Sequence, residues 1–183
     1  PTAARRVRYC DFAATEKKLS SDDPDFTAGI KLAHMDGVFY VEHVIHERLD
    51  PAGVDRLVLQ TAKADGLDVE IGIEQEPGAS GKSMAAYMIR LLSGYNVRAD
   101  TASGDKVTRA MPWFAQAQGG NVKLLRAAWN SDYLDEVTMF PVGAHDDMVD
   151  ATSGAFSRLT GGGGPIQQGA LPAKLRDWVG LNA

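Results

Sequence analysis

Apolar residues recur in short extended runs near the start of the chain and at helical spacing further on. The extended runs predict three consecutive strands, over residues 6–14, 26–34 and 38–48. The last two are separated by Met35-Asp36-Gly37, and an Asp-Gly pair between β-rich runs is typical of a tight hairpin. We therefore expect the chain to open with three strands that are antiparallel to one another.

Helices and strands are predicted to alternate through the rest of the chain. Asp50 suits the N-cap of a first helix and Pro51 its first turn, and apolar residues then follow at helical spacing up to Gly66. The same patterns predict further strands over residues 69–75, 96–100 and 122–125, and further helices over residues 80–92, 105–118, 131–140 and 146–159. Three strands followed by this alternation predict an α/β fold in which helices cover a mixed sheet.

Length and composition fit one globular domain. A chain of 183 residues with 44% hydrophobic and 23% charged residues can build a single core, which we place over residues 1–160. We expect residues 161–183, which begin with a run of glycines, to be a flexible tail or an arm that docks on a neighbouring domain. Because the chain starts at Pro1 with no signal sequence, we expect a fragment of a longer polypeptide. No apolar run approaches the roughly 20 residues of a membrane span.

Charge and cysteine usage narrow the classes of function. The net charge of −5 argues against a protein that holds nucleic acid through a basic surface. It does not exclude a nuclease, because carboxylates that bind divalent cations meet phosphate through the metal. The single cysteine, Cys10, leaves no internal disulfide and no cysteine-based zinc site.

Two carboxylates lie on predicted strands. Asp11 follows Cys10 within the first strand, where a buried charge needs a partner, so it is either a solvent-facing residue at a sheet edge or a ligand. Glu74 ends the fourth strand, and active sites of open sheets gather at the carboxyl ends of strands. Glu76 lies beyond that strand, in a predicted loop.

Three further carboxylates, Asp146, Asp147 and Asp150, open the last predicted helix. Acidic residues in a first helical turn ordinarily act as caps and dipole partners, but three exceed what that role requires. Asp147 and Asp150 are three residues apart and share a face, whereas Asp146 is better placed to cap the helix. His145, which precedes the three acids, is a candidate base or a residue that supports the ligands.

These carboxylates come from two strands and one helix, and together they favour a site for hard divalent cations. Mg²⁺ and Mn²⁺ prefer oxygen ligands, and a pair of such ions can promote phosphodiester cleavage. One histidine without a cysteine beside the acids does not predict a zinc site.

Three strings of residues carry a resemblance to a known family. They are IEQEPGASGKS (residues 73–83), GDKVTRAMPWFAQAQGGNVKLL (104–125) and FPVGAHDDMVDATSGAF (140–156). Over roughly residues 6–160 the chain resembles the C-terminal nuclease domain of the large terminase subunit of tailed phages. The order of its acids also resembles that of the retroviral-integrase and Holliday-resolvase superfamily. The resemblance implies a ribonuclease H-like fold.

The resemblance also implies an activity and a set of ligands. Asp11, Glu74 and Asp147 would coordinate two Mg²⁺ or Mn²⁺ ions, with Asp150 or Asp146 completing the set; by spacing, we rank Asp150 first. The implied reaction is endonucleolytic cleavage of concatemeric double-stranded DNA during genome packaging, in the cytoplasm of the host cell. The implied partners are an ATPase domain N-terminal in the same polypeptide, the portal and the small terminase subunit.

Basic residues near the predicted site are candidates for phosphate contacts. Lys82 begins a helix soon after Glu74, and Lys106 and Arg109 begin the next one, so we expect them at one end of the sheet. Lys123, with Arg126 close behind it, is a further candidate. The Gly-Lys-Ser of residues 81–83 lacks the glycine that a nucleotide-binding phosphate loop places five positions earlier.

Other interpretations stay open at this point. A Holliday-junction resolvase or a transposase-like enzyme would use the same metal site on branched DNA. A docking module of a packaging motor would use the acids only as helix caps. Trp113 and Phe114 lie at helical spacing with other apolar residues, and we predict that they belong to the core.

Overall fold

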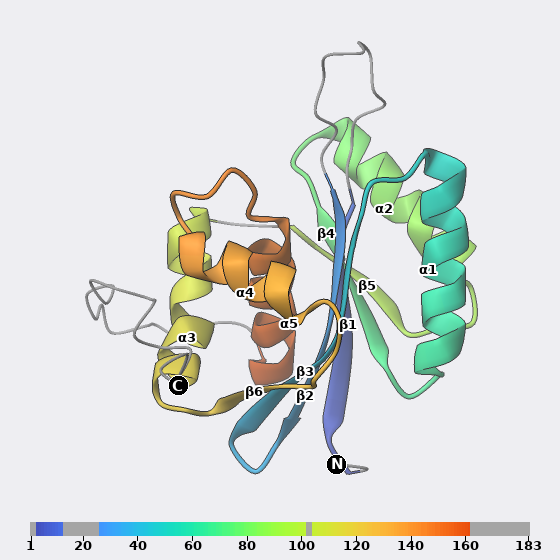
Figure 1. The fold of residues 1–183 in the computed structure, drawn as a ribbon. Helices are drawn as coiled ribbons and strands as arrows, with labels where there is room; N and C mark the ends of the chain where they lie inside the picture. The colour runs from blue at the N-terminus through green and yellow to red at the C-terminus, as the bar shows by residue number, and fades with distance from the viewer. Residues whose placement is uncertain (1–2, 13–25, 102–103, 162–183) are drawn as a thin grey trace.

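The computed structural model describes residues 3–12, 26–101 and 104–161 (Figure 1). The strands are β1 (Arg5–Asp11), β2 (Thr27–Met35), β3 (Val38–Glu47), β4 (Glu70–Gln75), β5 (Val97–Thr101) and β6 (Val122–Leu124). The helices are α1 (Pro51–Asp65), α2 (Ala79–Leu91), α3 (Lys106–Gln118), α4 (Asn130–Met139) and α5 (Asp147–Thr160). The predicted order of elements is confirmed. The first strand ends at Asp11, and residues 13–14 of its predicted range, like residues 162–183 of the predicted tail, lie outside the described residues.

The strands form one mixed sheet of six, in the order β5-β4-β1-β2-β3-β6. β2 is antiparallel to both of its neighbours, β1 and β3. The pairs β1–β4, β4–β5 and β3–β6 are parallel. Because β2 alone runs in the opposite direction, the carboxyl ends of the other strands meet at one edge of the sheet, where open sheets place their active sites.

The predicted hairpin joins β2 to β3. Asp36 and Gly37 both adopt positive φ, at 52° and 77°. Two central residues with positive φ are the signature of the two-residue hairpin turn whose twist matches that of the strands. The Asp-Gly pair therefore determines this turn locally, as the sequence predicts.

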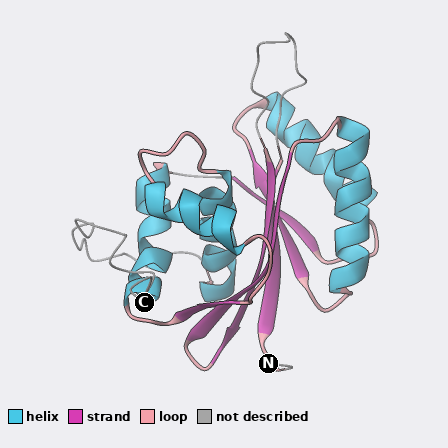
Figure 2. Cartoon of the chain, viewed as in Figure 1, coloured by secondary structure: helices cyan, strands magenta, loops and turns pink. Residues whose placement is uncertain are grey.

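Helices cover both faces of the sheet and give three layers (Figures 1 and 2). α1 and α2 lie on one face, and α3, α4 and α5 lie on the other. Alternate residues of β1 enter the two cores: Val7 and Tyr9 join the core beneath α5, and Cys10 joins the core beneath α1. Trp113 and Phe114 are buried in the α5 core, as predicted. None of the described helices has the length and apolar character that crossing a membrane requires.

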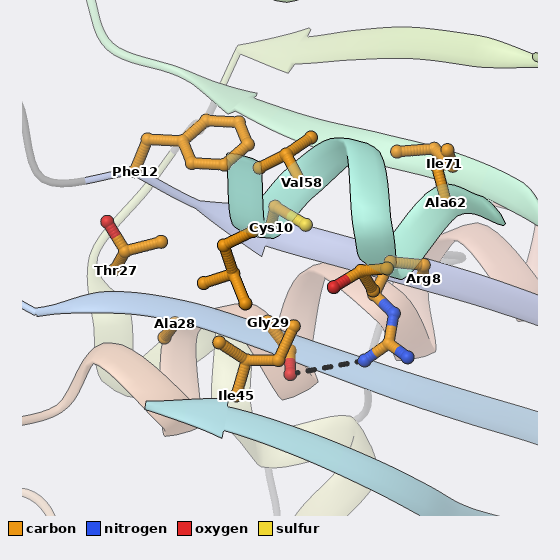
Figure 3. A pocket seen from close by; sticks show the side chains of 12 residues that line it. Arg8, Cys10, Phe12, Thr27, Ala28, Gly29, Ile45, Val58, Ala62 and Ile71 are labelled. Carbon is orange, nitrogen blue, oxygen red and sulfur yellow. Dashed lines mark hydrogen bonds between the residues drawn. The ribbon is translucent and has the colours of Figure 1, made fainter. Parts of the chain in front are cut away.

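α1 is capped as its sequence predicts and packs closely on the sheet. The side chain of Asp50 accepts a hydrogen bond from Gly53 N at 2.6 Å. Beneath the helix is a cavity of about 10 Å³ with an almost wholly apolar lining that includes Cys10, Ile45 and Val58 (Figure 3). A space of that size admits about one water molecule, so this core is close to fully packed.

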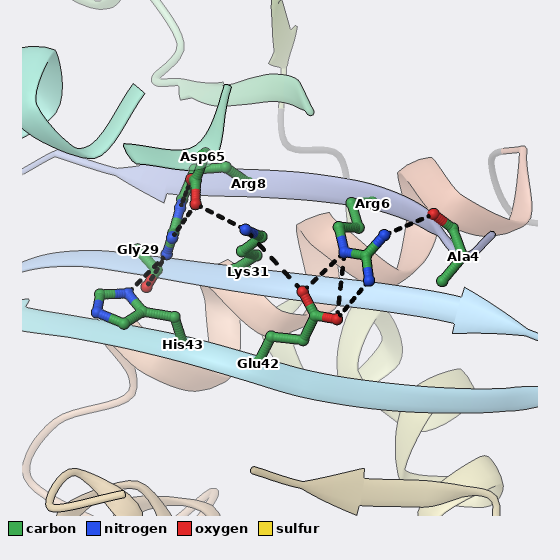
Figure 4. Close-up of polar contacts among 8 residues, drawn as sticks. All are labelled: Ala4, Arg6, Arg8, Gly29, Lys31, Glu42, His43 and Asp65. Atoms are coloured by element: carbon green, nitrogen blue, oxygen red, sulfur yellow. Dashed lines mark hydrogen bonds and ion pairs between the residues drawn. The ribbon is translucent and has the colours of Figure 1, made fainter. Parts of the chain in front are cut away.

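A network of ion pairs, which we call the back-face network, lies on the sheet beside α1 (Figure 4). Arg8 donates to both oxygens of Asp65, from Nε at 2.7 Å and from Nη2 at 3.1 Å. Lys31 Nζ lies 2.9 Å from Asp65 Oδ1, and Arg6 Nε donates to Glu42 at 2.9 Å. Burial would raise the pKa of Asp65, but the hydrogen bonds and charges of Arg8 and Lys31 outweigh it and lower that pKa.

Candidate metal centre

The alternation of β1 and β4 places Asp11 and Glu74 on the same face of the sheet. Asp11 follows Tyr9 by two residues and so faces the α5 layer, because side chains alternate along a strand. Ile73 joins the opposite core, so the next residue, Glu74, also faces α5. Cys10 pairs with Ile73 across the parallel strands, which brings the two carboxylates to the same level at the carboxyl end of the sheet.

α5 brings its acids to the same place because it lies very close to β1. A Cβ on Gly154 would stand 2.2 Å from Tyr9 Cε1, so only glycine permits this approach. One turn earlier in the helix is Asp150, whose side chain is only 4% exposed. Asp147 is 19% exposed and lies 4.0 Å from the His145 ring.

Two cations from α3 bind these carboxylates directly. Arg109 donates to Glu74 Oε1 at 3.0 Å and to Asp150 Oδ1 at 2.7 Å. Lys106 Nζ lies 2.6 Å from Asp146 Oδ1 and 3.0 Å from Asp150 Oδ2. Burial would lower the pKa of Lys106, but its hydrogen bonds to the two aspartates outweigh that effect and raise the pKa. Asp150 is thus held between both cations.

Burial raises the pKa values of the two strand carboxylates, Asp11 and Glu74. Burial, followed by the negative charges of Glu74, Asp150 and Asp147, raises the pKa of Asp11 from 3.8 to about 8. Burial also raises the pKa of Glu74, against the opposing charge of Arg109. We call Asp11, Glu74, Asp146, Asp147 and Asp150 the acidic cluster. Of these five, Glu74, Asp146 and Asp150 form ion pairs with Lys106 and Arg109.

The predicted capping role of Asp146 is wrong. Asp146 occupies the N-cap position of α5, but its side chain makes no capping hydrogen bond, because its carboxylate is bound to Lys106. Glu136 of α4 caps the helix instead: its Oε1 accepts from Met148 N at 2.7 Å and from Val149 N at 3.1 Å.

Glu136 was not among the predicted residues, although its position in the sequence contained a signal. Tyr133, Val137 and Phe140 form the buried stripe of α4, and Glu136 lies on the same stripe, three residues after Tyr133. A carboxylate on the apolar side of an amphipathic helix needs a buried partner. That partner is the first turn of another helix.

The structure divides the predicted basic residues into two groups. Lys106 and Arg109 are part of the acidic cluster. Lys82 is exposed on α2, which covers the other face of the sheet. Lys123 is exposed on β6, at the edge of the sheet farthest from β4 and β5. The structure therefore does not bring Lys82 or Lys123 to the acids.

The cluster suits divalent cations in the kind and charge of its groups. Its oxygens are hard ligands, and burial, followed by the negative charges of the neighbouring acids, raises the pKa of Asp11, which a divalent cation would oppose. Among the described residues, however, no three acidic, histidine or cysteine side chains are placed to hold an ion together. The side chains of Lys106 and Arg109 occupy the oxygens instead.

A groove of about 710 Å³ extends from the cluster along β4 and β5. Glu74, Arg109 and Asp150 line one end of it, and Arg98 and Arg158 line the other. Arg158 is paired with acids, while Arg98 is 67% exposed. The acids therefore lie at the end of an open groove and not in a closed pocket.

Comparisons with known proteins match most of the chain. A family model for the terminase RNase H-like domain matches residues 8–159. The nuclease domain of human cytomegalovirus terminase superposes with a TM-score of 0.59 at 15% identity, over 82% of this chain and 81% of that chain. Its Mn-soaked, inhibitor-bound form gives 0.59 at 13% identity, over 84% and 82%. Fowlpox virus resolvase, in complex with substrate Holliday junction DNA, gives 0.53 at 7% identity, over 85% and 97%.

No curated protein matches the chain. At these identities the structural similarities concern the fold, and they confirm the predicted ribonuclease H-like architecture.

Proposed function

The chain belongs to the family of terminase RNase H-like domains, and on that premise we propose that it is a metal-dependent endonuclease that cuts concatemeric double-stranded DNA during phage genome packaging. One observation carries the proposal. Carboxylates from β1, β4 and α5 converge at the carboxyl end of the sheet, and among the described residues they outnumber Lys106 and Arg109, the cations paired with Glu74, Asp146 and Asp150. Burial and the neighbouring acids raise the pKa of Asp11 to about 8. Such an excess is unfavourable for folding alone and is typical of a functional site.

We assign four ligands in this site. Asp11, Glu74, Asp147 and Asp150 would hold two Mg²⁺ or Mn²⁺ ions, which when bound supply an activated water and stabilise the leaving oxygen of the phosphodiester. Burial supports Asp150 over Asp146 as the fourth ligand, because the Asp150 side chain is 4% exposed and that of Asp146 is 35% exposed.

Lys106 and Arg109 would have two roles in turn. In the metal-free protein they neutralise part of the cluster through four ion pairs. With these oxygens bound to divalent cations, Lys106 and Arg109 would be free to contact the phosphates of the DNA backbone, the role expected from their place in the sequence. The groove along β4 and β5 would accommodate part of the substrate.

The remaining expectations belong to the same proposal. An ATPase domain in the same polypeptide would move the DNA, and the portal and the small terminase subunit would be the other partners, in the host cytoplasm. Lys82 and Lys123, which are exposed away from the cluster, would contact only a duplex that extends past the site.

Plasmid cleavage tests the proposal. Supercoiled plasmid is incubated with the purified chain and Mn²⁺, with EDTA in a parallel sample and Asp11→Asn as the matched variant. We expect nicked and linear products from the wild type alone. Products that persist in EDTA, or equal cleavage by Asp11→Asn, would contradict a carboxylate-bound metal.

The similarity in fold to a resolvase favours a second candidate, cleavage of branched DNA. Initial rates on a four-way junction and on a linear duplex of the same sequence separate the two. A packaging endonuclease cuts both at similar rates, whereas a resolvase strongly prefers the junction. A docking module is distinguished by calorimetry, because it would show no carboxylate-dependent Mn²⁺ binding.

A further inference from the structure

The helix that carries half of the assigned ligands does not cap its own first turn. Its N-cap residue, Asp146, directs its carboxylate to Lys106. The first backbone N–H groups of a helix have no partner within the helix and need an acceptor from outside. Here Met148 and Val149 are 1% and 0% exposed, so water cannot serve as that acceptor.

Glu136 of α4 supplies the missing acceptor. A single oxygen, Oε1, accepts from Met148 N at 2.7 Å and from Val149 N at 3.1 Å. The other oxygen, Oε2, faces His46 Nε2 at 3.9 Å, and the Phe26 ring stacks on that imidazole with centroids 3.8 Å apart. The carboxylate is thus confined between α5 and the edge of β3.

The capped residues lie directly between two of the assigned ligands. Asp147 precedes Met148 and Asp150 follows Val149, so the two hydrogen bonds hold the turn from which both carboxylates project. A second contact between α4 and α5 lies further along the helix, where Tyr133 Oη is 3.0 Å from Thr152 Oγ1. That contact joins the two helices through Thr152, whose hydroxyl also donates to Met148 O at 2.7 Å, but it supplies no acceptor to the N–H groups of the first turn.

We propose that Glu136 is a positioning residue for the metal centre: by capping α5 it sets the place of Asp147 and Asp150 and thereby the affinity of the site for divalent cations. The inference rests on the proposed function, since it concerns the same ligands. We attribute the effect on metal affinity to the acceptor oxygen of Glu136 and to the length of its side chain, which brings that oxygen to the N–H groups of α5. A carboxylate that merely stabilised the fold would change thermal stability without changing metal affinity.

Mn²⁺ binding by isothermal titration calorimetry on the full chain tests this assignment with three variants at one position. Glu136→Ala removes the acceptor. Glu136→Asp keeps the charge but shortens the reach, and Glu136→Gln keeps an acceptor oxygen at the same reach without the charge. Tyr133→Phe is the matched control, because it removes the neighbouring contact between α4 and α5. Melting temperatures in EDTA are measured in parallel.

We expect Glu136→Ala and Glu136→Asp to weaken Mn²⁺ binding about tenfold or more, the size of effect seen when a group that orients metal ligands is lost. Glu136→Gln should bind within about twofold of the wild type. Tyr133→Phe should lower the melting temperature and leave Mn²⁺ affinity unchanged. If Glu136→Ala does not fold, the difference in Mn²⁺ affinity between Glu136→Asp and Glu136→Gln tests the inference.

Two results would overturn the inference while leaving the proposed function intact. They are wild-type Mn²⁺ affinity in Glu136→Asp, and a loss of affinity in Tyr133→Phe as large as that in Glu136→Asp. Either would mean that Glu136 acts only on stability. A wild-type chain that binds no Mn²⁺ would reject the proposed function and the inference together.

Discussion

The acidic cluster and the back-face network are both built from carboxylates and basic side chains on the same sheet, but their charges are balanced differently. In the back-face network Arg6, Arg8 and Lys31 meet two carboxylates, Glu42 and Asp65. In the acidic cluster Lys106 and Arg109 pair with three of the five carboxylates, Glu74, Asp146 and Asp150. The pKa values differ in direction. Arg8 and Lys31 lower the pKa of Asp65 against the effect of burial, whereas burial, followed by the charges of neighbouring acids, raises the pKa of Asp11 to about 8.

The difference separates a structural use of buried charge from a functional one. Asp65 is only 6% exposed, and its partners compensate for the loss of hydration. The acidic cluster lies at the carboxyl edge of the sheet and beside an open groove, and its excess of negative charge costs stability until a cation arrives. A substitution in the acidic cluster should therefore reduce cleavage and not stability, and one in the back-face network should reduce stability and not cleavage.

The largest effect is expected from Asp11→Asn in the acidic cluster. The change preserves shape and removes one metal ligand, whose contribution to the transition state is several kcal/mol, so plasmid cleavage with Mn²⁺ should fall by about 10²- to 10³-fold. The melting temperature in EDTA should not fall, because the variant removes a carboxyl group whose ionised form is disfavoured in the folded protein. Cleavage close to that of the wild type would show that Asp11 is not a ligand.

Asp65→Ala in the back-face network should have the reverse profile. It leaves Arg8, which is 3% exposed, without its main partner, and breaking a buried ion pair in this way costs about 3–5 kcal/mol. We expect the melting temperature to fall by about 10 °C, while cleavage per folded molecule is unchanged. Differential scanning calorimetry and the plasmid assay below the transition measure the two quantities. A loss of cleavage with an intact fold would contradict the division between the two regions.

Arg109→Ala tests whether side-chain cations and metal ions compete for the same oxygens. Removing the guanidinium frees Glu74 and one oxygen of Asp150, whose other oxygen stays paired with Lys106, so Mn²⁺ affinity in the absence of DNA should rise about three- to tenfold. Calorimetric titration measures it, and Lys63→Ala, an exposed lysine on α1, is the control. Weaker Mn²⁺ binding by Arg109→Ala would mean that the arginine orders the ligands and does not compete for them.

The stability of the metal-free protein should depend on pH through Asp11. Its pKa rises from 3.8 to about 8 in the folded state, so between these values the folded protein holds a proton that the unfolded chain does not. The stability that Asp11 contributes is therefore fully present below pH 4 and is lost as the pH rises through 8.

Melting temperatures in EDTA at pH 5 to 8 measure this effect. The wild type should lose stability relative to Asp11→Asn as the pH rises, by a few degrees at pH 8. A difference between the two proteins that stays constant across this range would mean that Asp11 is ionised throughout.

The smallest effect is expected from Asp146→Ala. Its side chain is 35% exposed and is paired with a 52% exposed lysine, and pairs of this kind contribute about 0–1 kcal/mol. The melting temperature should therefore change by no more than about 3 °C. A larger loss, comparable with that of Glu136→Ala, would return the capping role to Asp146.

Features that depend on neighbours in the chain were predictable from the sequence. The Asp36-Gly37 turn adopts positive φ at both residues, and Asp50 caps α1, because both depend on residues only a few positions apart. The five acids of the acidic cluster could also be chosen as candidates from local patterns, since each lies at a strand end or at the start of a helix. The role of Asp146 could not be inferred in this way, because spacing suggested a cap while Lys106, 40 residues away, holds the side chain.

The order of the elements, the α/β class and the candidate carboxylates could be predicted from local patterns, because backbone preferences and the alternation of apolar residues act over a few residues. The pairing of charges, in contrast, depends on contacts between elements that are distant in the chain. The tertiary structure brought Arg109 to Glu74 across 35 positions and Glu136 to Met148 across 12, and it placed Lys123 at the far edge of the sheet. Such contacts follow from how closely α5 approaches β1 and how α3 and α4 pack against α5. No local pattern specifies these distances.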